Sequence, residues 1–241
     1  MARSNSSALQ TAKLLKAFTI DSPEWGITEL ADHLGYAKSS VHGIVQSLVN
    51  EGFLEKQAAN NKYSYGMQLI HLGLSAISKI KLRNLAKEVI QSLSDITGET
   101  VFLCMCKEGS LIVIDGREAD KALRLTIDIG SEMPLDRGSC GKICFSYSSE
   151  DEWREMTKGR SFDLSLLENS KSEVRKNGYA FSEEEVYENI NAMAAPIFNS
   201  QKRLEGMIVI GGLSARMSKE KMHEYAKILI SQCNWISSQL P

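Results

Sequence analysis

Long apolar segments are missing from this chain. No run of about 18 consecutive apolar residues occurs, which is the length a helix needs to cross a bilayer. The N-terminus lacks the apolar core of a secretory signal peptide, and the sequence has no internal repeats and no low-complexity tract. We therefore predict that no segment spans a membrane and that a membrane is not a partner.

Patterned cysteine and histidine residues are missing as well. The five cysteines are an odd number without paired spacing, which suits a reducing cytoplasm better than a disulfide framework. Cys104 and Cys106 would share one face of a strand, but no second C-x-C or H-x-H supplies further metal ligands, so core packing is the preferred interpretation. We predict a cytoplasmic protein with no metal and no cofactor.

The composition itself is ordinary. Apolar residues make up 43% of the chain and charged residues 24%, as in soluble globular proteins. The 241 residues leave room for two domains. A net charge of −2 argues against a wholesale electrostatic attraction to membranes or nucleic acid.

Residues 27–52 have the pattern of two helices joined by a tight turn. Thr28 is predicted to cap the first helix through its hydroxyl. Gly35 permits the turn, because glycine takes a positive φ at little steric cost. The second helix is expected to begin at about Lys38 and to end at Gly52, since glycine commonly follows a helix C-terminus. The residues predicted to face the core are Leu30, Ala31, Leu34, Val41, Ile44, Val45 and Leu48.

The other face of the second helix is predicted to contact DNA. Its residues are short or polar and none is acidic: Lys38, Ser39, Ser40, His42, Gly43, Gln46 and Ser47. Lys38 lies at the helix N-terminus, where free N–H groups already favour an anion. Gln46 can pair with adenine, and His42 or Lys38 can reach guanine. Ser39 and Ser40 suit phosphate contacts, which position the protein without reading sequence.

A two-stranded wing is expected to follow the second helix. Residues 53–57 and 62–65 alternate like strands, and residues 58–61 suit a turn between them. Lys56 and Lys62 would hold the wing against the DNA backbone.

The alternative is an amphipathic helical hairpin with a β-ribbon that binds nothing. Residues 1–60 contain five Lys and Arg but six Asp and Glu, whereas DNA-binding domains are usually positive. The acidic residues cluster outside the proposed contact helix. The charge balance therefore predicts modest affinity per subunit and binding by two or more subunits together.

Two further helices are expected around this unit. The first runs from Ser6 or Ser7 to about Ile20 and braces the other two. The second, from Met67 to Lys81, carries apolar residues around much of its surface. It packs either on a partner subunit or on its own domain, and this stretch alone does not decide between them.

The remaining residues, 82–241, predict a second domain with an antiparallel sheet of five or six strands and helices on its faces. The whole chain is then α+β: a DNA-binding domain at 1–66, a connector helix at 67–81 and the second domain. Helices are expected at 85–97, 153–156, 164–176 and after Ser218, with strands at 100–106, 111–114, 123–129, 178–181, 191–198 and 204–211 and a turn at 107–110.

Residues 134–142 indicate a ligand site at the start of a helix spanning 143–147. Exposed N–H groups there suit a carboxylate or phosphate, with Ser139 and Cys140 adding side-chain contacts. The acidic run at 183–185 is either a solvated surface or has one member facing the pocket. A catalytic Cys140 would need a base, and no histidine lies nearby in the sequence, so we predict no catalytic residues and no enzyme activity.

Three stretches in this order resemble the IclR family of bacterial transcription regulators: ITELADHLGYAKSSVHGIVQSLVNEGFL, PLDRGSCGK, and GYAFSEEEVYENINAMAAPIF with GMIVIGG after it. The resemblance covers nearly the whole chain. It departs from the family at Gly43, where an arginine usually follows the helix histidine. It implies a winged helix-turn-helix domain, a connector helix and a GAF-like effector-binding domain.

The resemblance also implies a function. The partners are a palindromic double-stranded DNA operator, bound by a homodimer or homotetramer, and a small organic-acid effector, a carboxylate from carbohydrate, glyoxylate or aromatic-acid breakdown. Two other classes stay open from the residues: a sensor that acts through a protein partner, and a metabolic enzyme with an appended helical domain. The family's pocket positions fall on Ala122, Leu125, Met133, Ser139, Cys140, Ser182, Ile190, Ala192, Val209 and Gly211.

Overall fold

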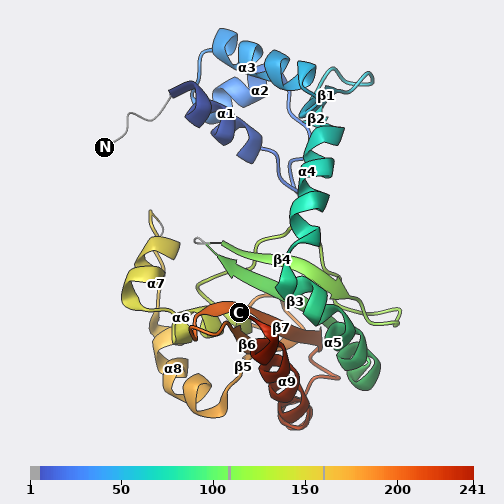
Figure 1. The fold of residues 1–241 in the computed structure, drawn as a ribbon, viewed down its shortest axis with the longest axis vertical. Coiled ribbons are helices and arrows are strands. Elements are labelled where there is room, and N and C mark those ends of the chain that lie inside the picture. The colour runs from blue at the N-terminus through green and yellow to red at the C-terminus, as the bar shows by residue number, and fades with distance from the viewer. Residues whose placement is uncertain (1–5, 108–109, 160) are drawn as a thin grey trace. The chain divides into compact units, whose positions relative to one another are not determined.

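The protein forms two compact units that divide between Lys79 and Ile80. The computed structural model describes residues 6–107, 110–159 and 161–241 (Figure 1). Across these residues no helix combines the length and the apolar character needed to cross a membrane.

Unit 1 is a three-helix cluster with a two-stranded wing and a final helix (Figure 1). Its elements are α1 (Ser6–Lys16), α2 (Ile27–Leu34), α3 (Lys38–Asn50), β1 (Leu54–Lys56), β2 (Tyr63–Tyr65) and α4 (Met67–Ser78). The wing strands are antiparallel, with Glu55 opposite Ser64. The apolar faces of the first three helices meet in one core, which buries Leu14, Leu30, Val41, Val45 and Leu54 almost completely. This arrangement is the predicted helix-turn-helix with its wing.

The turn between α2 and α3 forms as predicted, whereas the cap of α2 does not. Gly35 has a φ of 68° and Gly52 a φ of 73°, so each turn uses a backbone conformation that glycine adopts without strain. The N-cap of α2 is Gly26, and Glu29 accepts its N–H at 2.8 Å. The prediction that Thr28 caps this helix is therefore wrong. The helix begins one residue before Thr28, and the Glu29 side chain binds the backbone N–H of the N-cap residue.

The first helix also ends earlier than predicted, at Lys16 and not near Ile20. Side chains from distant segments donate hydrogen bonds to the carbonyl groups at its end. The Trp25 indole donates to the Ala17 carbonyl at 3.0 Å, and the Tyr65 hydroxyl lies 2.9 Å from the Leu15 carbonyl. These partners satisfy carbonyls that would otherwise need further helical turns.

Unit 2 is a five-stranded antiparallel sheet between two layers of helices (Figure 1). Its helices are α5 (Lys81–Thr97), α6 (Gly138–Tyr147), α7 (Glu150–Met156), α8 (Ser165–Asn177) and α9 (Lys219–Gln239). Its strands are β3 (Thr100–Lys107), β4 (Ser110–Arg117), β5 (Ala180–Glu183), β6 (Ile190–Phe198) and β7 (Leu204–Leu213), in the order β4-β3-β7-β6-β5. This is the predicted α+β architecture.

The alternation of residues along β3 separates two cores. Val101 and Leu103 pack with α5 and α9 on one face of the sheet. Phe102 and Cys104 pack with α6 and α8 on the other. Apolar side chains on both faces are what a sheet covered on both sides requires.

The predicted strand at 123–129 is absent. The edge of β4 bonds instead to the residues that follow, with the Val113 N–H donating to the Ser131 carbonyl at 3.0 Å. Leu125 and Ile127 still point toward the sheet, while Leu123 is exposed. The alternation that suggested a strand comes from an irregular segment packing alternate side chains on the core.

A turn was also predicted at 107–110. Its residues 108–109 lie outside the described residues.

Other predicted boundaries also move: α5 and α7 begin at Lys81 and Glu150, before the predicted 85 and 153, and β4 extends past 114 to Arg117. The stretch 67–81 is not one helix, because α4 ends at Ser78 and Ile80 is extended before α5. The helix expected at 143–147 begins at Gly138. The last helix begins as predicted, where the Ser218 hydroxyl caps α9 by accepting the Lys221 N–H.

A buried carboxylate joins the irregular segment to the end of β7. Glu99 is only 2% exposed, and Arg216 donates to both its oxygens at 2.7 and 2.9 Å while Lys121 donates at 2.8 Å. Burial acts to raise the pKa of Glu99, but the hydrogen bonds from Arg216 and Lys121 outweigh it and lower the pKa below its ordinary value of about 4.5.

This lowered pKa makes the stability of unit 2 depend on pH. A carboxylate with a depressed pKa stabilises the fold above its unfolded pKa, and the stabilisation is lost as pH falls through the folded value. Glu99→Gln should therefore lower the free energy of unfolding at neutral pH, and the difference from wild type should shrink below about pH 4.5. Urea unfolding across this range measures it, and a difference that stays constant with pH would contradict the prediction.

Candidate nucleic-acid interface and effector cup

The outer face of α3 is a continuous exposed surface without carboxylates. All the residues predicted to face outward on this helix are exposed: Lys38, Ser39, Ser40, His42, Gly43, Gln46 and Ser47. The opposite face of the helix buries Val41, Val45 and Leu48 in the core of unit 1. Because the apolar stripe fixes the rotation of the helix, the polar residues must face outward.

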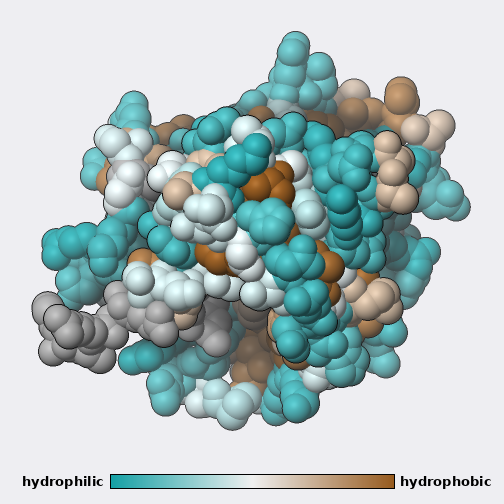
Figure 2. Space-filling view, turned by 90° about the horizontal axis from the view of Figure 1, so that it is seen from above, coloured by the Kyte–Doolittle hydropathy of each residue, from teal (hydrophilic) through white to brown (hydrophobic). Residues whose placement is uncertain are grey.

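The N-terminus of α3 is open to an anion. Its N-cap is Ala37, which has no side chain able to accept a hydrogen bond, and the first turn carries no acidic residue. Free N–H groups therefore remain beside Lys38, which suits a phosphate. In Figure 2 the face seen from above is mostly hydrophilic or intermediate, with apolar residues in small separate patches.

Two outward-facing residues on α3 have partners within the helix. Gln46 donates to the Asn50 side chain at 3.3 Å, and the Ser47 hydroxyl donates to the Gly43 carbonyl at 3.0 Å. The long Gln46 contact lies on the surface, where it can be exchanged for a base edge. Ser47 is less available, because its hydroxyl proton is used in the helix.

The two wing lysines differ. Lys56 is exposed, whereas Lys62 is paired with Glu29 at 2.9 Å. The pKa of Glu29 is lowered, first by the Gly26 N–H and then by Lys62. A solvent-exposed ion pair is weak, so Lys62 loses little free energy when it leaves Glu29 to bind a phosphate.

In unit 2, most of the predicted pocket residues come together. Eight line one cavity between the sheet and α6: Leu125, Met133, Ser139, Cys140, Ser182, Ile190, Ala192 and Val209. We call this cavity the effector cup. Its lining also includes Pro134, Arg137 and Gly138 of the predicted ligand stretch 134–142, and three residues that the sequence analysis did not single out: Phe102, Val186 and Tyr187. Apart from Phe102, these flank the predicted positions within a few residues along the chain, which is the signal that could have found them.

Two predicted positions do not line the cup. Ala122 is exposed on the irregular segment and is absent from the lining. Gly211 is buried behind Leu125, and a Cβ added to it would lie 2.7 Å from a Leu125 methyl carbon. Gly211 therefore lets Leu125 approach β7.

The cup is closed in this state. Its volume is about 30 Å³, which is room for roughly one or two water molecules. Small-molecule sites usually measure about 300–1,000 Å³. Val186 and Tyr187, between β5 and β6, line it, and Tyr187 is largely exposed.

The helix start that was predicted to bind a carboxylate holds one from the same chain. Glu185 accepts the Gly138 N–H at 3.0 Å and forms an ion pair with Lys142, whose Nζ also donates to the Phe181 carbonyl at 2.8 Å. Of the acidic run, Glu185 therefore contacts the start of α6, although it does not line the cup. Gly141 lets the first turn of α6 approach the backbone before it, since a Cβ there would lie 2.6 Å from the Leu135 carbonyl oxygen.

The ion pair between Glu185 and Lys142 should matter for stability. Their side chains are only 19% and 9% exposed. Glu185→Gln leaves the Lys142 ammonium without a counter-ion and should lower the free energy of unfolding by about 2–3 kcal/mol, somewhat less than for a fully buried pair. Urea denaturation measures it. Glu184→Gln, an exposed neighbour with the same change of charge, should have little effect, and equal losses in the two variants would argue against the pair.

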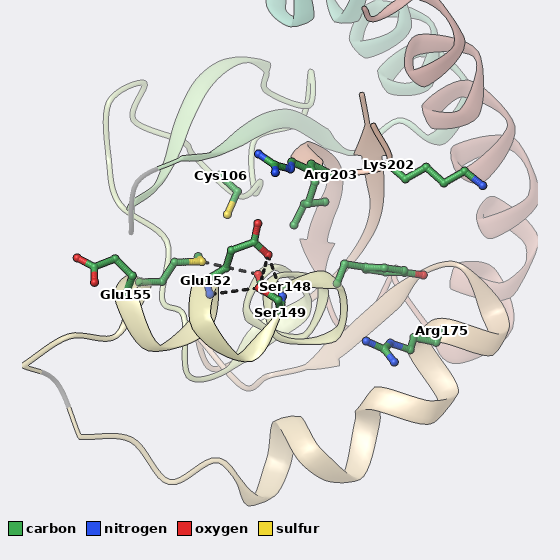
Figure 3. A pocket seen from close by; sticks show the side chains of 11 residues that line it. Cys106, Ser148, Ser149, Glu152, Glu155, Arg175, Lys202 and Arg203 are labelled. Atoms are coloured by element: carbon green, nitrogen blue, oxygen red, sulfur yellow. Dashed lines mark hydrogen bonds between the residues drawn. The ribbon is translucent and has the colours of Figure 1, made fainter. Parts of the chain in front are cut away.

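A second, larger cavity lies at the other end of α6 (Figure 3). Its volume is about 500 Å³. Figure 3 shows Arg203, Cys106 and Glu152 among the side chains that line it, with Ser149 hydrogen-bonded to Glu152. None of the predicted effector residues lines it.

Both units match families of known proteins. Residues 7–58 match the family model of the IclR helix-turn-helix domain, and residues 74–238 match that of the bacterial transcriptional regulator IclR C-terminal domain. The chain belongs to the IclR family. It is accordingly a DNA-binding transcription regulator and not an enzyme.

Relatives in the IclR family match this chain over most of its length. It is 29% identical to the HTH-type transcriptional regulator KdgR of Escherichia coli K12, covering 98% of this chain and 92% of that protein. It is 28% identical to the glycerol operon regulatory protein of Streptomyces coelicolor, covering 91% and 89%.

Solved structures share the fold at lower identity. An IclR family transcriptional regulator from Brucella abortus has a TM-score of 0.85 at 23% identity, over 99% of this chain and 94% of that one. An IclR homologue from Microbacterium hydrocarbonoxydans, crystallised in complex with 4-hydroxybenzoate, has a TM-score of 0.80 at 16% identity, over 97% and 98%.

Proposed function

We propose that this IclR-family regulator binds a palindromic operator as a homodimer or homotetramer in the bacterial cytoplasm, and that a small organic acid modulates the binding. The exposed face of α3, free of carboxylates, carries the proposal. Lys38, Ser39, Ser40, His42 and Gln46 supply its contacts in the major groove. Lys56, and Lys62 once released from Glu29, contact phosphates from the wing.

Association of subunits is supported by the apolar surface of α4. Met67, Ile70, Leu72 and Leu74 are all exposed on this helix, and none of its residues is buried. Leu15 and Tyr65 line a shallow hollow together with Leu69 and Ile70 of α4. A helix with apolar residues left uncovered is typical of an interface between protein chains. Two half-sites per operator would then compensate for the near-neutral charge of each unit 1.

The effector cup supports regulation by a small carboxylate. Its walls are mainly apolar, and its polar lining residues include Ser139, Ser182 and the cationic Arg137. The 4-hydroxybenzoate bound by the Microbacterium homologue is an aromatic acid of the kind that such a cup suits. Because the cup holds only about 30 Å³, the effector must bind an opened form. Val186 and Tyr187 are the side chains that must move.

Regulation then follows from a difference in affinity. A ligand that binds only the opened cup shifts the protein toward that form, and it changes DNA binding only if the two forms bind the operator differently. A coupling of about 1–3 kcal/mol changes operator affinity roughly 5–150-fold. Either sign of coupling is compatible with this cup, so the proposal covers both activation and repression.

The proposal is tested by selecting bound sequences from random DNA with the full-length protein. We expect enrichment of a palindrome whose half-sites are about one helical turn apart, or a multiple of it. Small carboxylates are then screened for a change in the affinity of that sequence. Absence of any enriched sequence would contradict operator binding. An enriched sequence whose affinity no carboxylate changes would contradict the effector role alone.

A further inference from the structure

Two cysteines of unit 2 lie with their sulfur atoms in contact. The Cys144 thiol donates to the Cys106 sulfur, and the two sulfurs are 3.4 Å apart. Cys106 comes from β3 and Cys144 from α6, so the pair bridges the sheet and the helix that packs on it. A disulfide has a sulfur–sulfur length of about 2.05 Å, so closure requires an approach of roughly 1.3 Å.

The two thiols differ in access to solvent. Cys106 is half-buried and lines the larger cavity (Figure 3), whereas Cys144 is completely buried. The other three cysteines, Cys104, Cys140 and Cys233, are also buried. The cavity of about 500 Å³ is much larger than a peroxide molecule. Of the five thiols, Cys106 is therefore the one that a small solute can reach.

The contact also activates Cys106. The hydrogen bond from Cys144 lowers the pKa of the Cys106 thiol, against burial and the Glu152 carboxylate, which both raise it. Donation to Cys106, together with burial, raises the pKa of Cys144 well above its ordinary value. A reachable thiol that forms the thiolate more readily beside a buried partner is the usual arrangement of an attacking and a resolving cysteine.

We propose that Cys106 and Cys144 form an oxidation site, in which a hydroperoxide converts the pair to an intramolecular disulfide. The Cys106 thiolate attacks one peroxide oxygen, the O–O bond breaks, and an alcohol or water leaves after taking a proton from solvent. Cys106 becomes a sulfenic acid. Cys144 attacks its sulfur, the S–O bond breaks, and the departing hydroxide takes the Cys144 proton as water. Two thiols lose two electrons in total, and the hydroperoxide gains them.

The bond would act on the helix that forms a wall of the effector cup. Cys140 lines the cup one turn before Cys144 on α6. Tying Cys144 to β3 restrains that helix, so oxidation should alter effector binding. This consequence rests on the proposed function of the cup, whereas the disulfide itself does not.

The test exposes the reduced full-length protein to increasing hydrogen peroxide, unfolds it in denaturant with N-ethylmaleimide to block the remaining thiols, and maps peptides without reduction. We expect three blocked thiols and a linked peptide pair containing Cys106 and Cys144, with all five thiols restored by dithiothreitol. Five blocked thiols after oxidation would overturn the proposal. So would a linkage that joins another pair or two chains.

Variants separate the two steps. In Cys144→Ala, Cys106 has no resolving thiol and should be trapped by dimedone as a sulfenic acid. In Cys106→Ala, Cys144 should stay reduced. Cys233→Ala removes a buried thiol on the opposite face of the sheet and should form the bond as wild type does. Circular dichroism checks that each variant is folded, and the wild-type linkage decides the question if one is not. Dimedone labelling of Cys144 in Cys106→Ala would contradict the assigned roles.

Discussion

Replacing Lys38 with glutamate should weaken operator binding by roughly 10- to 100-fold. Lys38 is exposed at the open N-terminus of α3, where its charge and the free N–H groups both favour a phosphate. The variant puts the first carboxylate on a face that has none. Each subunit of a dimer carries the change, so the loss is incurred at both half-sites.

The salt dependence of binding gives this prediction a second readout. Each phosphate contact contributes about −0.9 to the slope of log affinity against log salt concentration, so the slope should become shallower by about that amount per subunit. Fluorescence anisotropy with the selected operator at several salt concentrations measures both quantities. Lys87→Glu, an exposed lysine on α5 in unit 2, makes the same change of charge and should leave both near wild type.

Unchanged affinity and an unchanged slope in Lys38→Glu would mean that α3 does not lie against DNA. Equal losses in the Lys38 and Lys87 variants would mean that overall charge decides binding, and not this surface.

Replacing Ala192 with leucine should abolish the response to effector and keep DNA binding. Ala192 lines the effector cup from β6. The leucine side chain adds three carbon atoms inside the lining of a cup of about 30 Å³, so less room is left for an organic acid when the cup opens. In the wild type the effector should change operator affinity roughly 5–150-fold, and in Ala192→Leu it should cause no change. Operator binding with and without the screened carboxylate measures it.

Ala122 provides the matched control for this substitution. The family resemblance assigns it to the pocket, but it is exposed and does not line the cup. Ala122→Leu should therefore respond to effector as wild type does. Loss of the response in Ala122→Leu, or its retention in Ala192→Leu, would show that the effector does not occupy this cavity. Overpacking costs about 1–3 kcal/mol, so urea unfolding checks that Ala192→Leu is folded.

Local patterns predicted the elements of unit 1 well, because its helices are amphipathic and its turns need glycine. The spacing of Val41, Val45 and Leu48 fixes which side of α3 is buried, and the polar side is then exposed without further information. Local patterns failed where a distant residue completes a hydrogen bond. The end of α1 is set by Trp25 and Tyr65, which no pattern within the helix reveals.

In unit 2, residues 123–129 show the same contrast between a local pattern and a hydrogen bond to distant residues. Alternating apolar residues predicted a strand, but the edge of β4 bonds to residues further along. Alternation records which side chains are buried, and an irregular segment lying on a core can produce it as well as a strand can. The pocket positions came from family resemblance, and residues flanking them, such as Tyr187, were found only when the chain was folded.

By itself, the sequence determined the two-part organisation, the exposed face of α3 and the antiparallel sheet with helices on both sides, since these depend on periodicity and turn residues close together in the chain. Only the tertiary structure decided that Glu185 occupies the start of α6, that the effector cup is closed, and that Cys106 meets Cys144. Each of these joins residues about 40 or more positions apart, and such meetings depend on how the sheet and α6 pack.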